Sequence, residues 1–226
     1  MGEVIGQLLP TAVGVALSPL PIVGVILMLL SSKAKVNGPA FLIGWLLGLA
    51  IVVGGIVAFV NPDKLNKSDG NPSTLSGVLH LALGVLLLLL AVKQWKSRPA
   101  DGKEAEMPKW MAKMQDATPM FALGMGALLS GLNPKNLIFD IAAASSIVAG
   151  DLTSSQQIVA VVVFMILASL TIGTPVIWYL VAGESAKGTL DKLRVWLVQN
   201  NAAIMCVLFL IIGAKLIGQA LPAFFD

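Results

Sequence analysis

Long apolar runs separated by short polar stretches make up most of this 226-residue sequence. A helix needs about 20 consecutive apolar residues to cross a bilayer, and runs of about that length recur along the chain. We therefore expect residues 1–226 to form a single membrane domain, an all-α polytopic protein with six transmembrane helices. The predicted segments are Val4–Leu30, Pro39–Val60, Leu75–Val92, Pro119–Val148, Gln156–Ala182 and Ala202–Leu221.

Two of the six segments are interrupted near their middle by residues that disfavour a continuous helix. The first contains Ser18-Pro19-Leu20-Pro21, and the fourth contains Gly131-Leu132-Asn133-Pro134-Lys135-Asn136, with Asp140 a turn further on. Proline removes a backbone donor and displaces the residues before it, so both helices should break there. Asparagine is a favoured N-cap and proline a favoured first helical residue, so Asn133 should begin a new half-helix.

The two interrupted segments also predict an internal repeat. Gly14–Leu20 matches Gly126–Leu132 at an offset of 112 residues. Three segments per half is an odd number, so the second copy must be inverted in the membrane. We expect a first three-helix repeat over residues 1–95, a basic cytoplasmic linker over 96–117 and a second repeat over 118–226. Inverted repeats with broken corresponding helices are typical of transporters with a central binding site.

Composition and charge agree with this class. The chain is 57% hydrophobic and only 12% charged, whereas soluble domains are about 25% charged. Connections one, three and five hold two, six and three of the fifteen lysines and arginines, against only Lys64 and Lys67 on the other side. Because basic loops favour the cytoplasm, we expect the cytoplasmic (inner) membrane with both termini outside. The same topology explains the positive charge without a nucleic-acid partner.

The two breaks predict a site for an anion. Half-helices that begin at Ser18 and Asn133 would each present free backbone N–H groups and a partial positive charge. Lys135 lies at the positive end of its helix and so needs a compensating anion, which is Asp140, another protein group or a bound ligand. We expect a ligand as its partner for at least part of the time. The alternative is a polar plug that only satisfies the backbone exposed by the break.

Thr171 and Thr174 precede Pro175 in the fifth segment, and their hydroxyls either reach the same site or repair the helix backbone. Gly44 and Gly48 predict close packing between two helices. The sequence contains no metal-ligand cluster, phosphate-binding loop or activated nucleophile, so we expect no enzymatic activity, metal or cofactor. The candidate substrate-binding residues are Ser18, Pro19, Pro21, Ser130, Asn133, Pro134, Lys135, Asn136, Asp140, Thr171 and Thr174.

At these motifs the chain resembles the lysine exporter superfamily, whose six-helix members carry a proline pair in the first helix and Asn-Pro-Lys in the fourth. Leu20 departs from the Pro-Gly-Pro of the amino-acid exporters. The sequences Ser18–Pro21 and Asn133–Leu137, with the basic third connection, are more similar to the GAP, or Sap, family of peptidoglycolipid and sulfolipid addressing proteins. The resemblance implies two inverted three-helix repeats and movement of cell-envelope glycolipids or their precursors across the inner membrane.

The leading hypothesis is therefore an exporter or flippase for an anionic cell-envelope glycolipid or lipid-linked precursor. Lys135 and the two helix starts would bind the anionic group at the membrane midplane, and Asn136 would hydrogen-bond it. Asp140 would tune the charge of Lys135 or carry a coupling proton. The alternatives are an exporter of a small solute, such as an amino acid or metal ion, and a non-transporting scaffold subunit of an envelope-assembly complex. Envelope-assembly partner proteins and a homodimer stay open.

Overall fold

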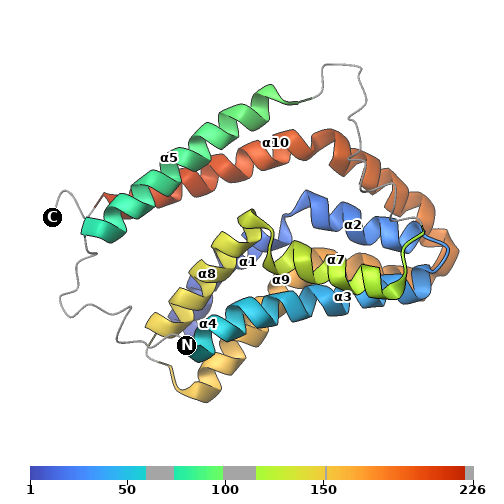
Figure 1. Cartoon of the computed structure of the whole chain (residues 1–226), viewed down its shortest axis with the longest axis horizontal. Coiled ribbons are helices and arrows are strands. Elements are labelled where there is room, and N and C mark those ends of the chain that lie inside the picture. The colour runs from blue at the N-terminus through green and yellow to red at the C-terminus, as the bar shows by residue number, and fades with distance from the viewer. Residues whose placement is uncertain (60–73, 99–115, 151, 222–226) are drawn as a thin grey trace. The chain divides into compact units, whose positions relative to one another are not determined.

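The computed structural model describes residues 1–59, 74–98, 116–150 and 152–221. These residues are almost entirely helical and contain no strand, which confirms the all-α prediction (Figure 1). The helices are α1 (Gly2–Ala16), α2 (Pro19–Leu30), α3 (Ala34–Leu49), the π-helix η1 (Ala50–Gly54), α4 (Gly55–Phe59), α5 (Thr74–Lys96), α7 (Pro119–Gly131), α8 (Pro134–Ala149), α9 (Ser154–Ala182), the 3₁₀-helix η3 (Gly183–Ala186) and α10 (Lys187–Ala220).

The chain divides into two compact units that do not follow the halves of the sequence. Unit one comprises residues 1–65 and 106–198, and unit two comprises residues 66–105 and 199–226. Each unit takes residues from both sequence halves, and α10 contributes to both units. All of the predicted site residues belong to unit one. The division of the chain into two three-helix repeats stays a prediction.

Two helical stretches are long and apolar enough to cross a membrane, Ala34–Phe59 and Ser154–Gly218. The pair α1–α2 provides a third if it counts as one broken span, because its two helices are bent by 56° at the break. The described residues therefore support two or three spans by length and composition, and the six-span arrangement stays a prediction.

Both predicted helix breaks are present. α1 ends at Ala16 and α2 begins at Pro19, and α7 ends at Gly131 and α8 begins at Pro134. Proline is the first residue of each second half, where its missing N–H costs nothing. The offset of 112 pairs Ser18 with Ser130, whereas the residue that caps α8 is Asn133, three positions later. The alignment at an offset of 112 therefore does not pair the two helix starts.

Glycines allow α3 and α7 to pack closely in unit one (Figure 1). A Cβ atom added to Gly44 would collide with the carbonyl of Leu123, and one added to Gly126 would collide with the carbonyl of Phe41. Gly48 leaves equivalent room for Ser130 of α7. The small residues thus bring two helix backbones into direct contact, as the spacing of Gly44 and Gly48 predicts.

In unit two, α5 and the last part of α10 lie side by side (Figure 1). Gly84 of α5 faces Gly213 and Ile217 of α10, and a Cβ atom on Gly84 would lie 2.9 Å from the carbonyl oxygen of Gly213. The basic linker continues from the end of α5, where the Arg98 guanidinium stacks 3.9 Å from the centre of the Trp95 ring. Residues 99–115 of that predicted linker lie outside the described residues.

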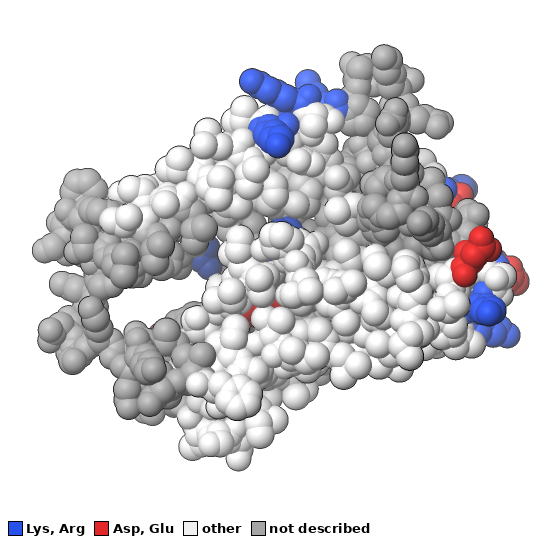
Figure 2. Space-filling view, in the orientation of Figure 1, with Lys and Arg blue, Asp and Glu red and all other residues white. Residues whose placement is uncertain are grey.

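Most of the described surface in view is uncharged, and red and blue atoms lie together mainly at the right edge of Figure 2. Large apolar side chains are exposed on the long helices of unit one, including Leu47 on α3 and Ile177 and Val181 on α9. Exposed apolar helix faces of this kind are expected where a helix contacts lipid. The surface therefore agrees with a membrane protein.

Candidate functional site

Asn133 begins α8 as its N-cap. Its Oδ1 accepts a hydrogen bond of 3.1 Å from the backbone N–H of Lys135, and its carbonyl accepts one of 2.8 Å from the N–H of Leu137. Pro134 follows as the first helical residue. The local sequence thus forms the predicted half-helix, because both cap and first residue favour a helix start at this point.

Asn136 joins the two broken helices. Its Nδ2 donates to the carbonyl of Leu129 near the end of α7 at 2.9 Å, and its Oδ1 accepts from the Ser18 hydroxyl at 2.8 Å. Asn136 is fully buried and Ser18 is nearly so. Ser18 is the N-cap of α2, but its hydroxyl makes no capping bond to that helix. The starts of α2 and α8 therefore lie together.

Lys135 reaches across to the end of α1. Its Nζ donates to the carbonyl oxygen of Gly14 at 2.7 Å and to that of Leu17 at 2.9 Å. The C-terminal end of a helix carries unsatisfied carbonyls and a partial negative charge, so it stabilises an ammonium group. The sequence left three partners open for Lys135, which were Asp140, another protein group and a ligand, and the partner in the structure is a protein group, the backbone of α1. The face of the Phe139 ring lies 5.8 Å from the same Nζ atom.

Thr171 completes the hydrogen bonding at the end of α1. Its hydroxyl, on α9, donates to the carbonyl of Ala16 at 2.6 Å. The Lys135 ammonium thus satisfies two carbonyls at the break in the first helix, and the Thr171 hydroxyl adds a second bond to the carbonyl of Ala16, which also accepts one of 2.9 Å from the N–H of Ser18. Thr174 lies on an exposed part of α9 and is not part of this cluster. Of the two predicted threonines, only Thr171 contacts the site.

Asp140 lies near these residues but differs from them in its hydrogen bonding. It is fully buried on α8, and neither carboxyl oxygen has a hydrogen-bond partner within the described residues. Among the described ion pairs none joins Asp140 to Lys135, although the two residues are only five positions apart. In the part of the chain that the structure describes, Asp140 is the only fully buried charged residue. An acidic group in this situation needs a chemical explanation.

One family model matches nearly the whole chain. A family model described as Sap, sulfolipid-1-addressing protein, matches residues 8–222 of the chain. The chain belongs to this family. Searches among curated proteins and among solved structures found no significant match. Sap family membership and the apolar helices together support a membrane protein with a lipid-related role in transport.

The remaining predicted residues of this Sap-family chain shape the two breaks. Pro19 and Pro21 are buried in the first turn of α2, whereas Pro134 is exposed at the start of α8. The Ser130 hydroxyl donates to the carbonyl of Ala127 within its own helix at 3.1 Å. Ser130 is fully buried where α7 meets Gly48 of α3, so it serves the packing of these helices.

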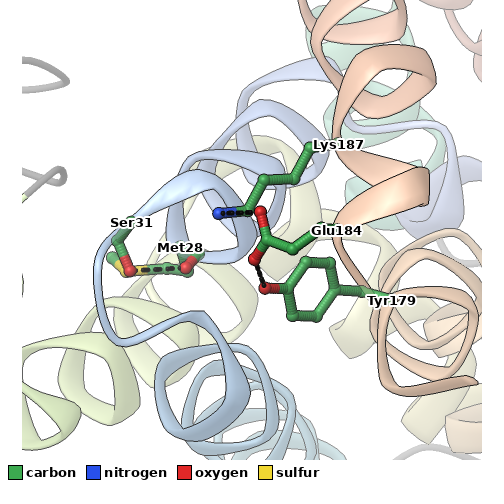
Figure 3. A network of polar contacts seen from close by, with 5 residues as sticks. All are labelled: Met28, Ser31, Tyr179, Glu184 and Lys187. Carbon is green, nitrogen blue, oxygen red and sulfur yellow. Dashed lines mark hydrogen bonds and ion pairs between the residues drawn. The ribbon is translucent and has the colours of Figure 1, made fainter. Parts of the chain in front are cut away.

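A second polar network, which sequence reasoning missed, connects the end of α9 to the start of α10 (Figure 3). The Tyr179 hydroxyl donates to Glu184 at 3.1 Å, and Lys187 forms an ion pair with Glu184 at 3.0 Å. Hydrogen bonds from Lys187 and Tyr179 lower the pKa of Glu184 below its ordinary value. Ser31, seen beside this network, donates to the carbonyl of Met28 at 2.7 Å. The only indication of this network in the sequence is that Glu184 and Lys187 are three residues apart, a spacing that allows an ion pair on one helix face.

The two threonines of α9 provide a matched test of the site geometry. Thr171→Val should destabilise this Sap-family protein by about 0.5–1.5 kcal/mol, because the carbonyl of Ala16 loses the hydroxyl bond and keeps only its bond from the N–H of Ser18. Thr174→Val makes the same chemical change at an exposed position and should cost almost nothing. Thermal unfolding in detergent measures both effects. Equal effects of the two variants would contradict the described contact.

Proposed function

We propose that this Sap-family protein moves an anionic cell-envelope glycolipid, or a lipid-linked precursor, across the cytoplasmic membrane. It would act as an exporter or flippase and not as an enzyme. Family membership supports a lipid-related role. One observation carries the preference for an anionic substrate. Within the described residues, the ammonium of Lys135 is bonded only to neutral backbone carbonyls, so its positive charge has no full negative charge in contact with it.

The surroundings of Lys135 make this positive charge unusual. The elements packed against α8 are α1, η1, α4, α7 and α9, and Glu3 at the start of α1 is the only charged side chain among them. On α8 itself, Asp140 is the only other charged residue and forms no ion pair with Lys135. A charged side chain in an apolar membrane segment is costly and is typically retained for function. An anionic headgroup would supply the full negative charge that the carbonyls lack.

The hydrogen-bonding capacity of Lys135 fits such a ligand. An ammonium has three N–H donors, and the carbonyls of Gly14 and Leu17 use two of them. A sulfate or phosphate oxygen could take the third N–H and then replace one carbonyl, since charge-assisted hydrogen bonds are stronger than neutral ones. The N-terminal end of α8 adds a favourable partial charge for the same anion.

The contact between Ser18 and Asn136 offers a place for the two broken helices to move against each other. In the proposed arrangement, six transmembrane segments form two inverted repeats with both termini outside. Rocking of one repeat against the other would expose Lys135 to each side of the membrane in turn. A homodimer or envelope-assembly partner proteins would be compatible with this mechanism, which needs only the residues of one chain at the site.

The proposal can be tested with a pair of lipids that differ by one charge. Fluorescent sulfatide carries a sulfate on its galactose, and fluorescent galactosylceramide is the same lipid without the sulfate. In proteoliposomes, the protein should move sulfatide between leaflets faster than galactosylceramide, as measured by the fraction accessible to a membrane-impermeant quencher. Equal rates would contradict selection of an anion.

Failure to move either lipid by correctly folded protein would contradict a flippase for anionic glycolipids. It would favour the alternatives, which are export of a small solute such as an amino acid or metal ion, or a scaffold role. Protein-free liposomes give the background rate for each lipid.

A further inference from the structure

Asp140 differs from the other polar residues around the two breaks. The side chains of Ser18, Lys135 and Asn136 each have a hydrogen-bond partner, whereas both carboxyl oxygens of Asp140 have none among the described residues. A fully buried carboxylate without a partner is far more costly than the neutral carboxyl group. The described conformation is therefore compatible with a proton on Asp140.

Among the described residues, no other charged group lies close enough to replace Lys135 as the electrostatic neighbour of Asp140. α1 runs antiparallel to α8, since Gly14 faces Phe139 while Val4 faces Gly150. Glu3 and the amino terminus are therefore near the far end of α8, about ten residues or roughly 15 Å from Asp140.

Tyr179 is the only titratable side chain on α9. Its hydroxyl bonds to Glu184, beyond the end of α9, and Tyr179 lies eight residues or about 12 Å further along the helix than Thr171 at the site. The elements η1, α4 and α7 contain no titratable side chain. Lys135 is thus the charged group to which the ionisation of Asp140 is coupled.

Two negative groups would compete for this single cation, the carboxylate of Asp140 and the anionic group of the substrate. With Asp140 ionised, Lys135 already has a counter-charge nearby, and an added anion would be repelled. With Asp140 neutral, Lys135 is free to bind the anion. Electrostatic coupling of this kind makes the binding of a proton and the binding of an anion mutually favourable.

From this geometry, we propose that Asp140 is a proton-binding site that controls the affinity of Lys135 for the anionic substrate. A proton from water on the loading side forms an O–H bond with the carboxylate, and this bond breaks on the opposite side, where the proton returns to water after the anion leaves. The loaded site, with Lys135 positive, the anion negative and Asp140 neutral, has no net charge. The empty site that has also released its proton, with Lys135 positive and Asp140 ionised, is neutral too, whereas the described conformation is the empty form with the proton bound. This inference rests on the proposed function.

The net charge of the site explains why an acidic residue would lie near Lys135. Both forms of the site that must change their exposure across the membrane are electrically neutral, which avoids the large cost of moving a net charge through an apolar environment. The described conformation corresponds to the anion-accepting form, because the ammonium of Lys135 is directed to the carbonyls of α1 and Asp140 has no counter-ion contact.

The pH dependence of sulfatide binding tests the coupling. The affinity of the wild-type protein in nanodiscs should fall by about 5- to 150-fold between acidic and alkaline buffer, the range typical of linked sites. Asp140→Asn mimics the neutral carboxyl group, so in a Lys135→Arg background, where the cation stays positive in both buffers, it should keep the same affinity in both. Glu3→Gln removes the carboxyl at the other end of α1 and should behave like the wild-type protein. A fall in affinity that persists in Lys135→Arg/Asp140→Asn but not in a buffer control would overturn the proposal.

Infrared spectroscopy tests the proton independently of any lipid. A protonated-carboxyl C=O band at neutral pH should be present in the wild-type protein and in Glu3→Gln, and lost in Asp140→Asn. Absence of this band from the wild-type protein would overturn the proton site even if sulfatide binds. If the band depends on Asp140 but sulfatide does not bind at any pH, the proposed function and the anion coupling fail while the proton site stands.

Discussion

Lys135→Gln is expected to reduce sulfatide binding by roughly thirtyfold and to abolish its movement between leaflets. The reason is the loss of the only positive charge that the described residues place near the two breaks in unit one. A hydrogen bond to a charged group contributes about 1.5–3 kcal/mol, and about 2 kcal/mol corresponds to a factor of roughly thirty in affinity. Sulfatide titration in nanodiscs and the leaflet assay measure the two effects.

Controls separate this role of Lys135 from its role as a structural plug. Thr171→Val also removes a donor from the end of α1 but changes no charge, so it should lower stability and retain sulfatide selectivity. Lys215→Gln removes an exposed lysine from α10 and should bind like the wild-type protein. Lys135→Arg keeps the charge and should retain part of the affinity. If Lys135→Gln and Thr171→Val lose stability alike and keep equal sulfatide binding, Lys135 is only a plug.

Gly126→Val should strongly destabilise unit one. Its added side chain would collide with the backbone of α3 at Phe41 and Trp45, and backbone atoms cannot move aside as a flexible side chain can. Overpacking of this kind costs about 1–3 kcal/mol and occasionally more, and here it would also separate the helices that support α7. Thermal unfolding in detergent, followed by circular dichroism, measures the loss.

Gly124→Val is the matched control on the same helix. A Cβ atom at Gly124 meets no atom within 4 Å, so the substitution should be close to neutral. Replacing glycine within a helix even offers a small gain in helix propensity, up to about 1 kcal/mol for alanine. Equal destabilisation by both valine variants would mean that the contact between α3 and α7 is not as close as described.

The predictions for Lys135→Gln and Gly126→Val concern neighbouring parts of unit one, the start of α8 and the packing of α7. Gly126 and Gly48 hold α7 against α3, and α7 ends where Asn133 begins α8. The position of Lys135 therefore depends on this packing, because α8 starts from the end of α7. A variant at Gly126 should lose both stability and sulfatide binding, whereas Lys135→Gln should lose binding far more than stability.

The sequence alone determined the features that depend on a few neighbouring residues. The all-α class follows from long apolar runs, because a helix satisfies its backbone hydrogen bonds within one segment. The breaks at Pro19 and Pro134 follow from the missing proline N–H and the clash of its ring with the preceding turn. Asn133 caps α8 through a bond to Lys135, only two residues away. Gly44 and Gly48 predicted a close helix contact, although they did not indicate that α7 would be the partner.

Only the tertiary structure decided which groups meet at the breaks. The hydroxyl of Ser18 bonds to a residue 118 positions away, and the ammonium of Lys135 reaches a carbonyl 121 positions away. Backbone carbonyls leave no mark in the sequence, so the partner of Lys135 could not be predicted. Thr171 and Thr174 are chemically equivalent in the sequence, but the orientation of α9 about its axis directs only Thr171 to the site. The isolation of Asp140 is likewise a property of the helices packed around it, since burial and missing partners exist only after the chain has folded.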